Sequence, residues 1–131
     1  MFLDASAIVA ILANEPDAAQ LGAKLSVSSV RLTSAIAIFE TVLAVARLND
    51  VDVERARQVV DRFLHLAEIQ IVDITRLEQE AALDAMSRYG KGRHPARLNM
   101  GDCFAYACAK THAAPLLFKG GDFSKTDIAV A

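Results

Sequence analysis

The chain alternates between short apolar runs, typical of buried strands, and longer stretches with the three-to-four-residue hydrophobic spacing of helices. The apolar runs predict strands at residues 2–4, 30–33, 69–72 and 115–118, and a last short strand at about 128–130. The longer stretches predict helices over residues 5–14, 17–25, 34–48, 53–66, 76–89 and 99–112. Strands alternating with helices indicate an α/β fold with a mainly parallel sheet of four to five strands, covered by helices on both faces.

Composition agrees with a single folded domain over residues 1–131. The length suffices to bury a substantial core, and 53% hydrophobic with 23% charged residues excludes a disordered chain. No apolar run is long enough to cross a membrane, and the N-terminus lacks the basic segment of a secretory signal. We therefore expect a cytoplasmic protein with no membrane partner. Cys103 and Cys108 have a helical spacing unsuited to a disulfide and are expected to be core residues.

Four acids are predicted to meet at one edge of the sheet. The carboxyl ends of parallel strands and the N-termini of the following helices share an edge, which is where ligands bind. Asp4 ends the first strand, Asp102 lies in the first turn of helix 99–112, and Asp122 follows strand 115–118 by a Gly-Gly turn. Glu40 lies in the second turn of helix 34–48.

Three of these acids also have simpler interpretations. Asp4 would cap the helix that begins at Ala5, and Asp122 would be an ordinary turn aspartate beside glycine. Asp102 would form a reciprocal capping pair with Asn99. These alternatives stay open at the level of sequence.

Glu40 is harder to explain, because it is the only charge in the apolar stretch 35–46. Burying a lone carboxylate is costly unless it is paired, protonated or bound to a cation. No basic residue occurs between Arg31 and Arg47, so an ion-pair partner would have to come from elsewhere in the chain. Gathered carboxylates favour a Mg²⁺ or Mn²⁺ ion, a common device of phosphoryl chemistry. Asp127 is an auxiliary candidate.

Charge is distributed unevenly along the chain, although the net charge is only −2. Residues 88–125 hold seven Lys or Arg and only two acids. A basic segment that encloses isolated acids is compatible with a phosphate-rich partner. An ordinary uneven surface is the alternative.

Several segments together resemble the PIN-domain ribonucleases, and more narrowly the VapC toxins of toxin–antitoxin pairs. The segments are 1–6 (MFLDAS), Glu40 in its apolar helix, 101–107 (GDCFAYA), 117–123 (LFKGGDF) and 126–128 (TDI). The resemblance covers essentially the whole chain. It implies a PIN three-layer α/β/α sandwich and metal-dependent endonucleolytic cleavage of RNA, often a tRNA or rRNA, to inhibit translation.

The resemblance also implies the site and the partners. Mg²⁺ or Mn²⁺ would be bound by Asp4, Glu40, Asp102 and Asp122, with Ser6 supporting the first acid by hydrogen bonding. A VapB-type antitoxin would neutralise the toxin, in a homodimer or toxin–antitoxin hetero-oligomer that contacts operator DNA only through the antitoxin. The RNA backbone would be gripped by basic residues near the rim, namely Arg88, Lys91, Arg93 and Arg97.

Two alternative functions are compatible with parts of the sequence. A receiver-like signalling module would share the length, the acidic rim and a lysine such as Lys119, with Asp73 as phosphate acceptor. It would leave Glu40 without a role. A catalytically inactive PIN-like binding protein is the second alternative, and the presence of all four acids argues against it.

Overall fold

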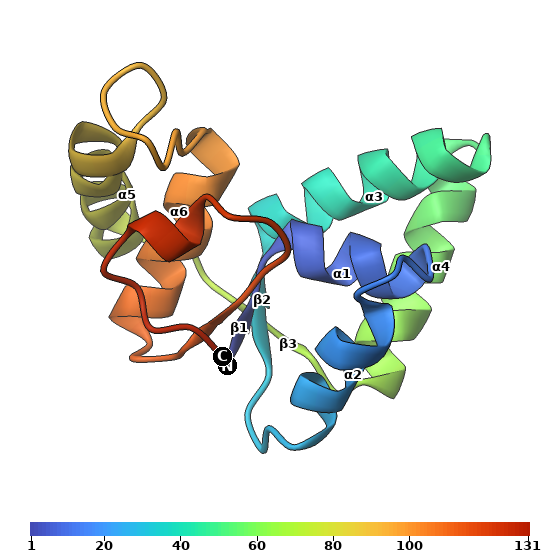
Figure 1. Cartoon of the computed structure of the whole chain (residues 1–131). Helices are drawn as coiled ribbons and strands as arrows, with labels where there is room; N and C mark the ends of the chain where they lie inside the picture. Colours follow the sequence, from blue (N-terminus) through green and yellow to red (C-terminus); the bar gives the residue numbers. More distant parts are fainter.

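A computed structural model describes all 131 residues of the chain. Its centre is a four-stranded parallel sheet in the order β3-β2-β1-β4 (Figure 1). The strands are β1 (Phe2–Leu3), β2 (Leu32–Ser34), β3 (Gln70–Val72) and β4 (Leu116–Leu117). β1 is central, with Phe2 opposite Leu32 of β2 on one side and Leu116 of β4 on the other. The sheet confirms the predicted fold class.

Six α-helices cover the two faces of this sheet and confirm all six predicted helical segments. They are α1 (Ala5–Leu12), α2 (Ala18–Ser26), α3 (Ala35–Asn49), α4 (Val53–Leu66), α5 (Arg76–Tyr89) and α6 (Met100–Thr111). Helices α1 to α4 lie on one side of the strands, and α5 and α6 lie on the other (Figure 1). No helix is long and apolar enough to cross a membrane.

Successive residues of the short strands point into two different cores, as the two-residue period of a strand requires. Phe2 and Leu116 belong to the core shared with α5 and α6. Leu3 and Leu117 belong to the core under α1 to α4. All four side chains are at most 1% exposed. Strands only two residues long therefore anchor both helical layers.

Three of the predicted strands are one or two residues too long, the strand predicted at 30–33 begins two residues too early and ends one too early, and the last one is wrong as an element. Asp4 is the point where β1 ends: its backbone N–H still donates to Leu117 of β4 at 3.0 Å, while its side chain already caps α1. In the tail, only a single parallel bridge joins Val130 to Leu116. The backbone N–H of Leu116 donates to Ala129 at 2.8 Å, and that of Ala131 donates to Leu116 at 3.0 Å. A short 3₁₀ helix, η1 (Phe123–Lys125), was not predicted.

The strand order bears on the receiver alternative. Doubly wound receiver folds have the order 2-1-3-4-5, with the third strand beside the first. Here β4 lies beside β1, and β3 forms the far edge. Asp73, which follows β3, is therefore at the margin of the sheet, and the topology argues against a receiver.

Candidate active site

Asp4 is positioned by the passage from β1 into α1. It is the N-cap of α1, it is 4% exposed, and its Oδ2 accepts hydrogen bonds from the backbone N–H of Ser6 at 3.0 Å and from the Ser6 hydroxyl. Burial raises the pKa of Asp4, and the two bonds from Ser6 oppose that rise. The capping interpretation is thus correct in geometry, but it leaves a nearly buried carboxylate at the edge of the sheet.

Ser6 also connects Asp4 to the segment after β4. Its hydroxyl oxygen accepts the backbone N–H of Lys119 at 3.0 Å. The side chain of Lys119 forms an ion pair with Glu15. The expected supporting role of Ser6 therefore has a physical basis, because one hydroxyl fixes the first acid against the loop that leads to Asp122.

Glu40 lies on α3, whose start is fixed by Ser34, the last residue of β2 and the N-cap of the helix. The Glu40 side chain is half-buried and takes part in none of the salt bridges of the structure. Its pKa is raised, first by burial and then by the negative charges of Asp4 and Asp102. No basic residue from elsewhere in the chain forms an ion pair with Glu40 that would offset the cost of burying its charge.

Asp102 forms the reciprocal capping box that the sequence suggested. Its carboxylate accepts the Asn99 backbone N–H at 2.8 Å, and its own N–H donates to the Asn99 side chain at 3.0 Å. Burial raises the pKa of Asp102, the bond from Asn99 lowers it, and the charges of Asp4 and Asp122 raise it again. Asp102 is therefore both a cap and a member of the acidic group.

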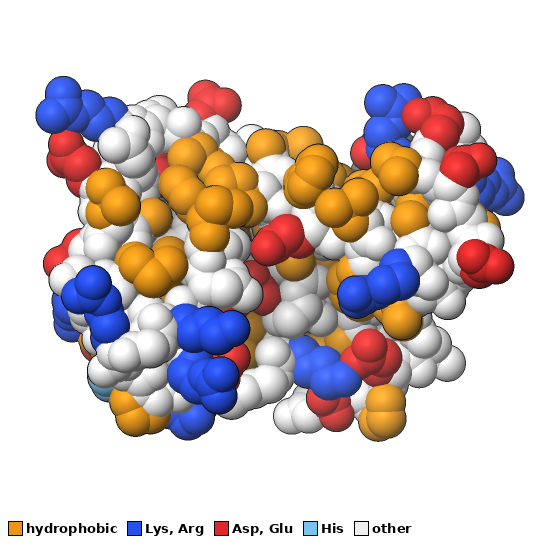
Figure 2. All heavy atoms as spheres, turned by 90° about the horizontal axis from the view of Figure 1, so that it is seen from above, with side chains coloured by type: hydrophobic (Ala, Val, Ile, Leu, Met, Phe, Trp, Pro, Cys, Tyr) orange, Lys and Arg blue, Asp and Glu red, His pale blue; other side chains and the backbone are white.

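Asp122 is the exposed member of the group. It precedes η1 without making a side-chain capping bond. Together with Asp102 and Asn99 it lines a hollow of about 270 Å³, which Lys91 and Arg97 also line. Figure 2 looks onto this edge of the sheet. It shows acidic side chains in the hollow between the α1–α4 side and the α5–α6 side, with basic side chains close by. The structure thus brings all four predicted acids to one edge.

The donor set fits a divalent cation, although no three of these side chains lie close enough to form a finished metal site. Carboxylate oxygens are the ligands that Mg²⁺ and Mn²⁺ prefer. Burial is the main cause of the raised pKa values of Glu40 and Asp102, and neighbouring carboxylates add to it: Asp4 and Asp102 raise the pKa of Glu40, and Asp4 and Asp122 raise that of Asp102. A divalent cation bound among these acids would offset the repulsion between their like charges.

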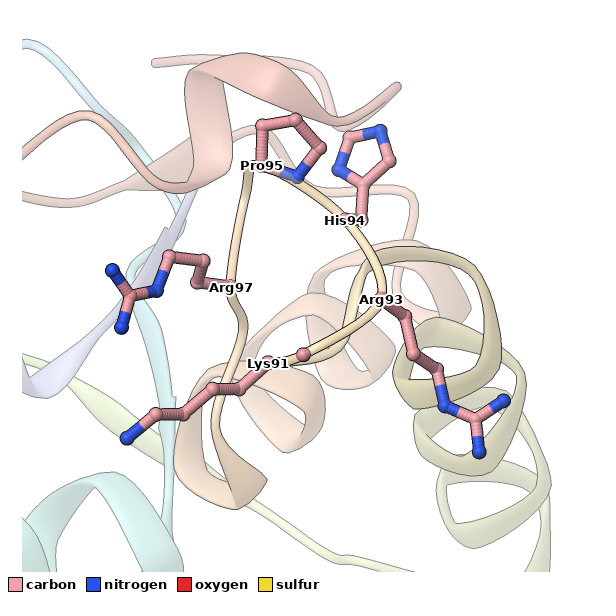
Figure 3. Close-up of a pocket in the computed structure, with 6 residues that line it drawn as sticks. Lys91, Arg93, His94, Pro95 and Arg97 are labelled. Atoms are coloured by element: carbon pink, nitrogen blue, oxygen red, sulfur yellow. The ribbon is translucent and has the colours of Figure 1, made fainter.

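The four basic residues predicted near the rim separate into two groups. Figure 3 shows Lys91 and Arg97 pointing toward the strands, and Arg93 pointing away over α5. Arg97 has a positive φ of 53°, an uncommon conformation for this residue type. Arg88 does not reach the acids, because its guanidinium contacts Asp84, Asp127 and the ring of Tyr89. Of the four, only Lys91 and Arg97 line a hollow together with Asp102 and Asp122.

Asp127 lies in a different cluster from the four acids. Its carboxylate accepts the hydroxyl of Tyr106 at 2.6 Å and contacts Lys110 at 3.3 Å and Arg88 at 3.4 Å. These contacts, above all the bond from Tyr106, hold the pKa of Asp127 well below its usual range. They connect the C-terminal segment to α5 and α6, so the structure does not bring the auxiliary candidate into the acidic group.

One residue of the site had no predicted role. Gly101, the buried residue before Asp102, lies directly against the Glu40 carboxyl group. A glycine inside the first turn of a helix was the available signal, since glycine is otherwise unfavourable there.

A family model confirms the resemblance: the PIN domain model matches residues 1–129. The VapC ribonuclease Mb0640 of Mycobacterium bovis is 44% identical over 130 residues, which cover 98% of this chain and 96% of that protein. Ribonuclease VapC of Mycolicibacterium smegmatis is 43% identical over 130 residues, covering 98% of each chain.

Solved structures agree on the fold. The crystal structure of Mycobacterium tuberculosis VapC20, a sarcin-ricin loop cleaving toxin, has a TM-score of 0.78 at 17% identity and covers 99% of this chain and 97% of that one. A toxin–antitoxin complex from Klebsiella pneumoniae has a TM-score of 0.71 at 18% identity, covering 99% and 95%. With its sheet, its acidic edge and its full-length relatives, the chain belongs to the PIN-domain family and is a homologue of the VapC ribonucleases.

Proposed function

We propose that this protein is a divalent-metal-dependent endoribonuclease that acts as the toxin of a toxin–antitoxin pair. The observation that carries the proposal is the group of four acids at the carboxyl edge of the sheet, among which Glu40 is half-buried with no ion-pair partner. We propose ribonuclease activity because the full-length relatives are named as ribonucleases. The proposal includes inhibition of translation through cleavage of a tRNA or rRNA.

Each acid has a proposed role in binding Mg²⁺ or Mn²⁺. Asp4 and Asp102 are the proposed direct ligands, because each is fixed rigidly at the start of a helix. Glu40 and Asp122 would hold a second ion or metal-bound waters. A bound ion would polarise the phosphate and lower the pKa of a water. Glu40 would then accept a hydrogen bond from the attacking water, and hydrolysis would leave a 5′-phosphate and a 3′-hydroxyl.

Lys91 and Arg97 are the proposed contacts to the RNA backbone. Both line the hollow that holds Asp102 and Asp122, so a phosphate bound there would lie beside the acids. Contacts of this kind position a nucleic acid without reading its sequence. Arg93 would contribute only through its charge at longer range.

The proposed inhibitor is a VapB-type antitoxin that covers the acidic edge. Exposed apolar side chains on α3 provide surface for it, including Phe39 at 65% and Leu43 at 44% exposure. Figure 2 shows hydrophobic side chains along the rim of the acidic hollow. Homodimer formation, and binding to operator DNA through the antitoxin alone, belong to the same proposal.

The test is RNA cleavage by the purified chain with Mg²⁺, with Mn²⁺ and with excess EDTA. We expect cleavage with either metal and none with EDTA. Asp4→Asn and Asp102→Asn should abolish cleavage while the protein stays folded, because asparagine retains the capping oxygen. Equal cleavage in EDTA, or full activity of either folded variant, would refute the proposal.

A further inference from the structure

Gly101 occupies the second position of α6, between Met100 and Asp102. It is buried against the side chain of Glu40 from α3. An ideal Cβ built on Gly101 would lie 2.6 Å from the Cδ of Glu40 and closer still to both carboxylate oxygens, inside the 3.0 Å that real Cβ atoms respect. The Glu40 carboxyl group therefore occupies the space that any other residue at position 101 would fill.

The backbone of α6 gives no reason for a glycine at this position. Gly92 and Gly120 are the glycines with positive φ, and Gly101 is not among them. Glycine inside a helix is destabilising relative to alanine. The helix would thus be more stable with alanine at position 101, and the feature that glycine serves is the contact with Glu40.

We propose that Gly101 is a positioning residue, whose missing side chain lets the Glu40 carboxylate lie against the first turn of α6 beside Asp102. The proposal rests on the proposed metal site and extends it to a residue that binds no metal. The first turn of a helix carries the positive end of its dipole, which favours a carboxylate at this place. Two acids on different helices are thereby held on adjacent surfaces.

An alanine at position 101 should displace the acid and leave the helix intact. The atoms in its way are the far end of a flexible side chain, so Glu40 moves more easily than the backbone of α6. The variant should therefore combine unchanged or increased stability with a poorer metal site. Loss of a supporting contact around a metal site typically costs about 10- to 100-fold in affinity.

The test compares Gly101→Ala with Gly22→Ala. Gly22 lies inside α2, and a Cβ there meets nothing within 4 Å. Thermal unfolding in EDTA should show that both variants are at least as stable as the wild type. Mn²⁺ affinity, measured by calorimetry without RNA, should fall about 10-fold or more for Gly101→Ala and stay unchanged for Gly22→Ala.

A double variant identifies Glu40 as the intermediary. In a Glu40→Ala background, adding Gly101→Ala should cause no further loss of Mn²⁺ affinity, because the displaced carboxylate is already absent. If Gly101→Ala binds Mn²⁺ as tightly as the wild type, or loses as much Mn²⁺ affinity in the Glu40→Ala background as in the wild type, the role of Gly101 is overturned. The proposed function is not affected by either result. A wild-type protein that binds no Mn²⁺ and cleaves RNA in EDTA would overturn the proposed function, and the role of Gly101 with it.

Discussion

The hydroxyl of Ser6 donates a hydrogen bond to Oδ2 of Asp4, the same oxygen that accepts the Ser6 backbone N–H at 3.0 Å. The hydroxyl oxygen in turn accepts the backbone N–H of Lys119 at 3.0 Å. Asp4 follows β1 and Lys119 follows β4, so this one side chain fixes the relative positions of two neighbouring strand ends. Both bonds from Ser6 favour the ionised form of Asp4 against the effect of burial.

Replacing Ser6 by alanine should change both stability and pH dependence. The N–H of Lys119 loses its acceptor, which should lower the free energy of unfolding by about 0.5–1.5 kcal/mol in urea titrations. The pKa of Asp4 should rise further, because one of the bonds that lower it is lost. The acidic limb of the pH–rate profile for RNA cleavage should therefore move to higher pH.

Ser6→Thr is the matched control, since it keeps the hydroxyl group. It should retain the acidic limb of the wild type. An unchanged acidic limb in Ser6→Ala would show that the Ser6 hydroxyl does not tune Asp4.

Much of the site was predictable because Asp4, Asp102 and Asp122 are placed by local rules. Each lies just after a strand or at the start of a helix, and in a parallel sheet such positions share one edge. Glu40 was predictable for a different reason: burying a single charge in an apolar helix is costly unless the charge is paired or bound to a cation. The helices followed from periodicity, and the start of α6 from its capping pair, Asn99 with Asp102.

The features that the sequence did not predict depend on contacts between distant segments. Asp127 pairs with Tyr106 and Lys110 of α6, and no local pattern distinguishes that partnership from membership of the acidic group. Arg88 is drawn into the same cluster by the position of the C-terminal segment. The contact of Gly101 with Glu40 joins two helices about sixty residues apart, so spacing along the chain could not reveal it.

Removing the cation at position 97 should weaken RNA binding without disturbing the loop. Arg97→Asn is the preferred change, because asparagine tolerates the positive φ of 53° found there. We expect lower affinity for a fluorescent single-stranded RNA in EDTA. The slope of log affinity against log salt should fall in magnitude by about one for each phosphate contact that is lost. Lys91→Gln should behave in the same way.

Arg93→Gln provides the control for net charge, since Arg93 points away from the strands (Figure 3). Its salt dependence should change much less than that of Arg97→Asn. An equal effect of all three substitutions would indicate a diffuse electrostatic attraction and would exclude a specific contact in the acidic hollow.

Glu40 should make the metal-free protein less stable as pH rises. Its pKa in the folded state is raised by burial and by Asp4 and Asp102, so the folded state holds a proton that the unfolded chain has released. The free energy of unfolding therefore falls as pH rises. The fall begins as pH passes the pKa of Glu40 in the unfolded chain and is complete above its pKa in the folded state. Glu40→Gln should remove this contribution. In EDTA, the stability of the variant relative to the wild type should therefore increase between pH 4 and pH 8.

Thermal unfolding across that pH range measures the difference. Asp61→Asn, at an exposed position of α4, is the control for simple loss of a negative charge. Adding Mn²⁺ at pH 8 should reverse the order and stabilise the wild type more than Glu40→Gln, since a ligand stabilises the state that binds it. A constant difference at every pH would contradict the raised pKa of Glu40 in the folded state.

Asp127→Asn should lower stability and leave the metal site unchanged. The asparagine can still accept the Tyr106 hydroxyl, but it loses the charge that faces Lys110 and Arg88. The Asp127 side chain is 46% exposed, so we expect a loss of only about 1 kcal/mol at pH 7. Because the pKa of Asp127 is depressed, its contribution is present above the unfolded pKa of about 3.9 and disappears as pH falls below it.

The stability difference between Asp127→Asn and the wild type should therefore shrink in urea titrations as the pH is lowered from 7 toward 2. Asp84→Asn is the control, because the salt bridge of Asp84 is with Arg88, at 3.5 Å, and its side chain is 63% exposed. It should cost less than about 0.5 kcal/mol. Mn²⁺ affinity should equal that of the wild type in both variants, since neither carboxylate lies in the acidic group. A marked fall in Mn²⁺ affinity for Asp127→Asn alone would show that Asp127 contributes to the metal site.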